Sequence, residues 1–361
     1  MSAPYVAVIE TDTMRLMGVI DVYTSMTQTD RWCSPGEWEL TLPATAAAVE
    51  LMRVGRMIVA DGYAGMIESI DISQADDADQ IQARGCDLGG LLALRLALPA
   101  AGAEYAVYEG APGAVMAQIV RDNCISPALP ARAYPHMDIG IVDNSGESIS
   151  VQVRYDTVAA VLESIGTAHG LCWRVRLDDG RMLLDIRAAR DLSASQEIEP
   201  PVIYAPEYGN VTGQAYTHDV SKAYNAAVVA GSGSGAEREV CWVGLDAAGY
   251  LRRETYLTAR GYVSLSEAGE QALLKYAPRR ALEGELTGGG AYSYGKHWRV
   301  GDIITVRHLP WGVSMDVQVT EVLRVYEGDV VQIEAVLGDG ALTLVDVVQR
   351  ALATSEEEAR R

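Results

Sequence analysis

The sequence of 361 residues contains no phenylalanine, and its aromatic side chains are instead mainly those of 18 tyrosines and 6 tryptophans. It also has no stretch close to the roughly 18 consecutive apolar residues that a membrane-spanning helix needs. We therefore expect a soluble chain. The first ten residues, MSAPYVAVIE, contain no basic segment followed by a long apolar run, so we expect no secretory signal and synthesis in a cytoplasm.

Closely spaced cysteine pairs are also missing. The five cysteines lie far apart, and none forms a Cys-x-x-Cys motif: Cys33, Cys86, Cys124, Cys172 and Cys241. This spacing is typical neither of a zinc site nor of a disulfide framework. We expect buried, reduced thiols.

Negative charge predominates, with 49 acidic residues against 29 lysines and arginines and a net charge of −20. The acidic residues are spread along the chain, which argues against binding to a phosphate backbone. Two interpretations remain open. The charge can serve solubility alone, or it can line a channel through which DNA slides because like charges repel its phosphates.

The length exceeds that of one ordinary domain, which usually holds about 100–200 residues. Alternating apolar residues predict strands at both ends of the chain, and helical spacing appears between them. We expect a mainly β fold with α+β inserts and two related small β-barrel domains. The expected parts are a first β-barrel (hub) domain at 1–100, an α+β domain at 101–200, second-barrel strands with a helical α+β insert at 201–296, completion of that barrel at 297–340, and a C-terminal amphipathic helix at 341–361.

Local signals predict several elements within these parts. The segment ATAAAVELMRVG after Pro43 predicts a helix that ends at Gly55. Residues at helical spacing predict two further helices, in GAVMAQIVRDN and TVAAVLESIGTAHG. Asp178, Asp179 and Gly180 predict the turn of a hairpin. Ser264 with Glu267 forms a capping box for a helix that ends before Pro278.

An internal repeat relates residues 54–83 to residues 300–335. Four features match in the same order. Val54 and Gly55 match Val300 and Gly301, and the strand at 57–59 matches the strand at 303–305. Met66, Ile67 and Glu68 then match Val319, Thr320 and Glu321, and a Gln-Ile-x-Ala ending occurs at 80–83 and again at 332–335. Duplication of one barrel pattern explains this order, and chance similarity of strand-rich segments is the alternative. Three chains with two barrels each can close into a pseudo-sixfold ring, which matches a sixfold tube on one side and a threefold object on the other.

Five segments spanning nearly the whole chain suggest a family. They are RWCSPGEWELTLP at 31–43, GCDLGGLLALR at 85–95, AVVAGSGSGAERE at 227–239, KYAPRRALEGEL at 275–286 and HWRVGDIITV at 297–306. In this order they resemble the tail hub, tail-associated or minor tail proteins of phages with long non-contractile tails. That family is similar in architecture to the baseplate hub of contractile phage tails.

The resemblance implies a structural protein of the virion tail tip. It implies a homotrimer whose pseudo-sixfold ring joins the tail tube to the tip and forms part of the DNA ejection conduit. The implied partners are a distal tail protein or tail tube ring, the tape-measure protein, and tip fibre or receptor-binding proteins. DNA would pass through the lumen only in transit, and this chain would not insert into a membrane.

The residues give little support to an enzyme. The histidines are scattered without a His-Glu-x-x-His motif: His136, His169, His218, His297 and His308. His218 and Asp219 are adjacent and would point in opposite directions on a strand. Gly231, Gly233 and Ala236 satisfy the Gly-x-Gly-x-x-Ala spacing of a dinucleotide site, but a strand follows them instead of a helix, so we expect a hairpin loop.

Glu37 and Glu39 lie two residues apart on an expected strand and could form an acid–base pair. Since nothing beside them suggests a sugar cleft, we expect a pair that faces solvent or the lumen. We predict no catalytic, cofactor-binding or metal-binding residue, and no cofactor. The alternatives are a hub with cell-wall-degrading or peptidase activity, or a β-rich hub of a related injection apparatus. One side of the expected last helix carries Leu342, Val345, Val348 and Leu352. This helix would dock on its own subunit or form a three-helix seam with its copies.

Overall fold

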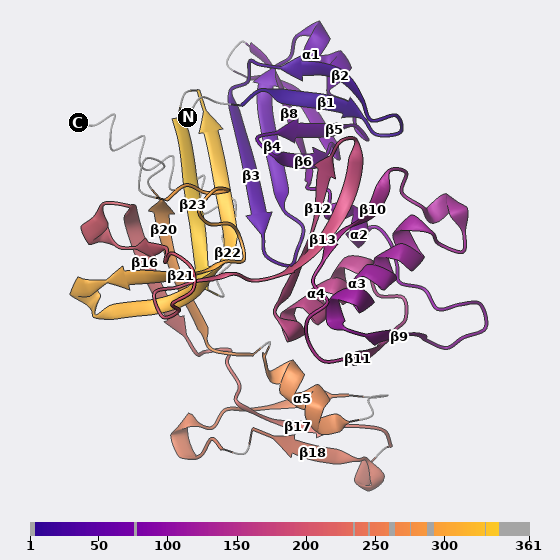
Figure 1. Cartoon of the computed structure of the whole chain (residues 1–361), viewed down its shortest axis with the longest axis vertical. Coiled ribbons are helices and arrows are strands. Elements are labelled where there is room, and N and C mark those ends of the chain that lie inside the picture. Colours follow the sequence, from indigo (N-terminus) through magenta and orange to yellow (C-terminus); the bar gives the residue numbers. More distant parts are fainter. Residues whose placement is uncertain are drawn as a thin grey trace. The chain divides into compact units, whose positions relative to one another are not determined.

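The computed structural model describes residues 4–75, 78–233, 235–244, 246–259, 264–274, 276–286, 292–328 and 330–338. The chain divides into two compact units, Met1–Gly213 with Gly284–Ala335 and Gln214–Glu283 with Val336–Arg361. Each is described by itself. The fold is mainly β with a few helices, as expected (Figure 1). The C-terminal helix expected at 341–361 lies outside the described residues.

The N-terminal part of the first unit contains two groups of strands and one short helix. Its elements are β1 (Val6–Glu10), β2 (Arg15–Ile20), β3 (Ser25–Arg31), β4 (Glu37–Pro43), α1 (Ala46–Leu51), β5 (Met57–Ala60), β6 (Tyr63–Met66), β7 (Ser69–Ala75) and β8 (Ala78–Cys86). One sheet has the order β2-β1-β5-β6, and β3-β4-β8-β7 follow one another in a larger sheet. An isolated antiparallel β-bridge between Gly65 and Asp87 connects these two sheets. Among the described residues, strand pairing does not continue around a closed ring.

The core of this part follows from the alternation of apolar and polar residues along its strands. On β4, Trp38, Leu40 and Leu42 are buried in one cluster with residues of β1, β5 and β8. The intervening Glu37 and Glu39 face away from this cluster. Helix α1 is shorter than the sequence predicted. It ends at Leu51 rather than continuing to Gly55, because residues 53–56 form a hydrogen-bonded turn instead.

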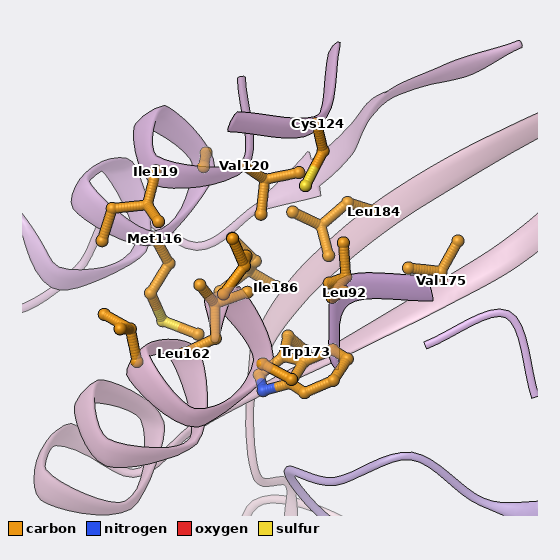
Figure 2. Close-up of a cluster of buried hydrophobic side chains, with 14 of the residues drawn as sticks. Leu92, Met116, Ile119, Val120, Cys124, Leu162, Trp173, Val175, Leu184 and Ile186 are labelled. Atoms are coloured by element: carbon orange, nitrogen blue, oxygen red, sulfur yellow. The ribbon is translucent and has the colours of Figure 1, made fainter. Parts of the chain in front are cut away.

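The α+β part of the first unit contains the predicted helices and hairpin. Its elements are α2 (Gly90–Ala93), β9 (Ala106–Gly110), α3 (Pro112–Val120), a π-helical turn (Arg121–Ile125), β10 (Met137–Val142), β11 (Ile149–Val153), α4 (Val158–His169), β12 (Leu171–Asp178) and β13 (Arg181–Ala188). Asp179 and Gly180 have φ of 45° and 71°, the left-handed conformation that a two-residue hairpin turn needs. Helices α3 and α4 cover the β12–β13 hairpin, and Met116, Leu162 and Ile186 meet between them (Figure 2).

The rest of the first unit continues the larger sheet. Its strands are β14 (Asp191–Leu192), β15 (Ile203–Tyr204), β21 (Ile303–His308), β22 (Val313–Glu327) and the first part of β23 (Val330–Gly338), whose residues from Val336 on are assigned to the second unit. Strand β21 pairs with β22 in antiparallel fashion and with both β14 and β15 in parallel fashion. Strand β23 lies next to β22 on the other side.

The second unit contains a small sheet covered by one helix. The elements of this region are β16 (Val211–Asp219), β17 (Ala226–Ala230), β18 (Val240–Val243), β19 (Glu254–Thr258), α5 (Leu265–Leu274) and β20 (Arg279–Leu286). The sheet has the order β18-β17-β19, and Ala227, Val229 and Val243 form its core with Ala268 of α5. The hydroxyl of Ser264 accepts a hydrogen bond from the backbone N–H of Glu267, as the capping box predicts.

The first copy of the sequence repeat contains a turn built on a glycine. Gly55 has φ of +90°, a conformation that glycine adopts more readily than other residues. Its N–H donates to the carbonyl of Ile67 at 2.8 Å, and the N–H of Ile67 donates to the carbonyl of Arg56 at 2.8 Å. A third bond, from Arg56 N–H to the carbonyl of Arg53, closes the turn at 3.1 Å.

The second copy contains the same turn with the same three hydrogen bonds. Gly301 has φ of +93° and donates to the carbonyl of Val319 at 2.7 Å. The N–H of Val319 donates to Asp302 at 2.9 Å, and the N–H of Asp302 donates to Arg299 at 3.2 Å. The repeated unit is therefore present in the backbone as well as in the sequence.

The hydrogen bonds also correct the alignment of the two copies. The sequence comparison matched Val319 with Met66, whereas the turn places Val319 at the position of Ile67, one residue later. Ile67 and Val319 are both buried, with exposed fractions of 1% and 0%. Because a shift of one residue would turn a strand's buried face outward, burial determines the register. The apparent match of Glu68 with Glu321 is therefore offset by one position.

The two glycines differ in what surrounds them. A Cβ atom built on Gly55 would meet no other atom within 4 Å, whereas one built on Gly301 would lie 1.9 Å from ring atoms of Trp32. We expect Gly55→Ala to lower the free energy of unfolding by about 1–2 kcal/mol, the cost of a left-handed backbone at a residue with a Cβ. Gly301→Ala should cost roughly a further 1–3 kcal/mol, because Trp32 must move. Urea unfolding of both variants measures the difference, and equal losses would contradict the role of Trp32.

Candidate functional site: the junction of the two repeats

Strand β3 pairs with β22 of the second copy, and β4 connects β3 to β8 at the end of the first copy. The antiparallel register of β3 and β22 runs from Arg31 opposite Glu321 to Ser25 opposite Glu327. Figure 1 shows the two strands side by side, although their paired residues lie about 290 positions apart in the sequence. This pairing places side chains from both ends of the chain in one buried interface, which we call the junction.

A buried ion pair lies within the junction. Arg324 on β22 and Asp30 on β3 are each only 6% exposed, and Arg324 Nη2 lies 3.1 Å from Asp30 Oδ2. The other terminal nitrogen of Arg324, Nη1, lies 3.4 Å from Oδ2 of Asp61, in the turn between β5 and β6. One guanidinium group thus connects β22 with strands of both N-terminal sheets.

Two tyrosines complete the network around this ion pair. The hydroxyl of Tyr294 donates to Asp30 Oδ2 at 2.7 Å, and the hydroxyl of Tyr326 donates to Asp61 Oδ2 at 2.9 Å. Burial, reinforced by the neighbouring carboxylates, raises the pKa of both tyrosines. The pKa of Arg324 is raised by Asp30 despite the opposing effect of its burial. All three side chains therefore keep their protons, and Arg324 keeps its positive charge.

Asp87 is a second carboxylate beside the junction. Its Oδ2 accepts a hydrogen bond from the N–H of Gly36 at 2.9 Å, and its Oδ1 accepts one from the N–H of Gly90 at 3.3 Å. Burial, with a smaller contribution from Asp30, raises the pKa of Asp87 to about 6, although the N–H of Gly36 opposes the shift. Asp87 consequently titrates just below neutral pH.

A cavity of about 420 Å³ lies next to the junction, and we call it the arginine cavity. Its lining comes from the end of β3, the β12–β13 hairpin and the repeated turn at residues 299–302. Six arginines and four aspartates contribute to it: Arg31, Arg174, Arg176, Arg187, Arg190, Arg299, Asp30, Asp87, Asp185 and Asp302. Trp32 and Trp173 also line it. The positive lining contrasts with the net charge of −20 of the chain.

The residue that follows each repeat glycine is charged and buried, with opposite sign in the two copies. Arg56 forms an ion pair with Glu10 at 3.2 Å and donates to the carbonyls of Glu50 and Leu51 at the end of α1. Asp302 instead accepts two hydrogen bonds from Arg190, at 3.0 and 2.5 Å. The same turn therefore anchors a helix end in one copy and the segment that leads into β14 in the other.

The structure places the two candidate glutamates as the strand pattern predicted. Glu37 and Glu39 both face away from the core, and each is paired with an arginine. Glu37 lies 3.1 Å from Arg31, and Glu39 lies 2.8 Å from Arg84. Carboxylates held in these ion pairs do not form an acid–base pair around a cleft.

The other candidates are not brought together. The glycine segment lies between β17 and β18, which pair in antiparallel fashion, and its described residues include a 3-10 turn at Gly235–Glu237, as expected of a hairpin loop. His136 contacts the carbonyl of Asp12 at 3.0 Å, and His308 stacks on Trp311. His218 and Asp219 lie at the end of β16. Within the described residues no three histidine, cysteine or acidic side chains are placed to hold a metal ion.

The cysteines are free thiols, as expected from their spacing. Cys33 and Cys124 are buried, while the other three are partly buried. Burial raises the pKa of Cys124 to about 12, which keeps this thiol protonated at neutral pH. No helix among the described residues combines the length and the hydropathy needed to cross a membrane.

Sequence reasoning missed both the junction and the arginine cavity. Asp30 and Arg324 are separated by most of the chain, and neither belongs to a motif. One signal was present in the segment Val322–Tyr326, where apolar residues occupy both faces of the strand around a single arginine. A charged residue at such a position requires a buried partner, but the sequence does not show which acidic residue it is.

Residues 6–339 match the family model described as "Siphovirus ReqiPepy6 Gp37-like protein". No curated protein matches the sequence.

Several solved structures share the fold at low sequence identity. A tail protein from Neisseria meningitidis MC58 is 14% identical, with a TM-score of 0.59 over 93% of this chain and 97% of that one. The 43 kDa tail protein of prophage MuSo2 from Shewanella oneidensis is 12% identical, with a TM-score of 0.61 over 92% and 98% of the two chains. The prophage tail protein gp18 from Listeria monocytogenes EGD-e is 11% identical, with a TM-score of 0.60 over 97% and 99%.

Removing the central charge of the junction should strongly destabilise the protein. We expect Arg324→Met to lower the free energy of unfolding by about 3–5 kcal/mol, because Asp30 would remain buried without its counter-charge. The matched control is Arg84→Gln, which breaks the pair with Glu39 at a side chain that is 46% exposed and should cost less than about 1 kcal/mol. Urea unfolding measures both, and similar losses would contradict a central role for Arg324.

Asp87 should make stability depend on pH. Its pKa is higher in the folded protein, about 6, than the ordinary value of 3.8, so its contribution is most favourable below pH 4 and is lost as the pH rises to 6. The loss should amount to roughly 3 kcal/mol. Unfolding of the wild type and of Asp87→Asn at pH 4, 5, 6 and 7 isolates this contribution. Asp87→Asn should remove that decline, and parallel pH profiles would show that Asp87 does not cause it.

Proposed function

This chain belongs to the family described as Siphovirus ReqiPepy6 Gp37-like protein, and from this premise we propose that it is the hub subunit of a phage tail tip. By family and fold it is a structural protein of the phage tail or baseplate type. In the proposed assembly three copies form a homotrimer, and their six repeat units surround one axis with pseudo-sixfold symmetry. This ring joins the tail tube to the tip.

The glycine turn that both repeats share is the observation that most supports this proposal. Gly55 and Gly301 have the same backbone conformation, and the same three hydrogen bonds follow each of them. A chain with two copies of one unit can present two similar surfaces to its neighbours. Three such chains can then contact six equivalent subunits of a tube, whereas a chain with a single unit would need six copies.

The ring would also form part of the conduit through which DNA leaves the tail. An acidic chain suits this role, since a negative lumen does not retain a passing phosphate backbone. We propose contacts with a distal tail protein or tail tube ring, with the tape-measure protein, and with tip fibre or receptor-binding proteins. The division of the chain at residues 100, 200, 296 and 340, the tail-tip location and the lack of catalytic activity belong to the same proposal.

The mass of the protein in solution tests the ring. We expect sedimentation equilibrium to show a species of three times the 38.8-kDa chain mass at high concentration. Electron micrographs of that species should show an annulus with six similar densities. A monomer at every concentration, both alone and with the purified tail tube protein, would contradict the proposal.

A further inference from the structure

The arginine cavity has no role in the proposed ring, yet its chemistry is specific. Its lining brings together guanidinium groups from three separate segments of the first unit: the end of β3, the β12–β13 region and the repeated turn at 299–302. A volume of about 420 Å³ lies within the usual range for small-molecule sites, roughly 300–1,000 Å³. The cavity can therefore hold a small ligand but not a folded partner.

Most of the charges in the lining are already neutralised within the protein. Arg190 pairs with Asp302, while Arg176 and Arg187 both lie 3.0 Å from Asp185. Arg31 pairs with Glu321 at 2.8 Å. Asp30 is held by Arg324.

Two arginines of the lining have no such ion pair among the described residues, although the charge of Arg174 lowers the pKa of Asp87. Within the part of the chain that the structure describes, neither the guanidinium of Arg174 nor that of Arg299 lies within 4.0 Å of a carboxylate oxygen. In the described ranges the guanidinium of Arg174 donates only to the carbonyl of Gly62, at 3.3 Å, and that of Arg299 donates only to the carbonyl of Gly295, at 3.2 Å. The backbone N–H of Arg299, in contrast, donates to Asp302 Oδ2 at 2.7 Å. Each guanidinium has five N–H donors, so most of their hydrogen-bonding capacity is unused.

We propose that the arginine cavity binds a small phosphate-bearing anion through Arg174 and Arg299. A planar guanidinium matches two oxygen atoms of a phosphate at once, and a tetrahedral group can accept such pairs from more than one direction. A carboxylate presents its two oxygens in one plane, so it can form paired hydrogen bonds only with a guanidinium that lies in that plane. Two unpaired arginines from different segments therefore favour a phosphate over a carboxylate.

Titration calorimetry of the full chain with inorganic pyrophosphate tests the site. In a chloride buffer of constant ionic strength we expect saturable binding at one site per chain. Arg174→Gln and Arg299→Gln should each weaken binding roughly 10- to 100-fold, the effect of losing a charged hydrogen bond. Arg15→Gln is the matched control, because Arg15 is exposed on β2, outside the cavity lining, and its side chain donates to Met17, so the affinity of this variant should equal that of the wild type.

Further measurements distinguish the loss of a binding group from unfolding of the variant. Urea unfolding of each variant shows whether it is folded, and Arg174→Lys, which keeps the charge but loses the planar fork, should bind with intermediate affinity. Succinate, a dicarboxylate, should bind at least tenfold more weakly than pyrophosphate. The absence of saturable binding by the wild type, equal affinity of the two glutamine variants and the wild type, or equal affinity for succinate would each overturn the proposal.

Discussion

The ion pair between Asp30 and Arg324 is the interaction on which the architecture of the first unit depends. It lies at the pairing of β3 with β22, where an early strand and a late strand of the unit meet. Two charges buried this deeply stabilise a fold only when their hydrogen-bonding capacity is also used. Tyr294 and Asp61 use much of that capacity, whereas Nε of Arg324 has no hydrogen-bond partner among the described residues. The pair therefore selects one register for a contact between distant parts of the chain.

The two repeats retain a common backbone but differ in what they contact. Gly55 lies in an open environment and Gly301 lies against Trp32, while the next residue is an arginine in one copy and an aspartate in the other. If the two units were identical, each could pack equally well against the neighbours of the other. Opposite buried charges give each unit its own set of neighbours, since Arg56 needs Glu10 and Asp302 needs Arg190.

Much of the local structure could be predicted from the sequence. Turn chemistry at Asp179 and Gly180, helical spacing in α3 and α4, and the capping box at Ser264 are determined by residues close to one another, and each prediction is confirmed. The register of the repeat was wrong by one residue because it depends on which side of a strand is buried. The junction could not be predicted, since its ion pair joins positions that no local pattern relates. The arginine cavity was missed for the same reason, because Arg174 and Arg299 come from distant segments.

The pairing of β3 with β22 also has a consequence for how the protein is made. Translation proceeds at about 5–20 residues per second, so β3 leaves the ribosome roughly 15–60 seconds before the β22 residues, about 290 positions later, that cover its edge. During that interval its backbone N–H and C=O groups form an unpaired edge that can bind other strands. Because Thr27, Gln28 and Asp30 on this strand are polar, β3 exposes little hydrophobic surface before β22 is synthesised.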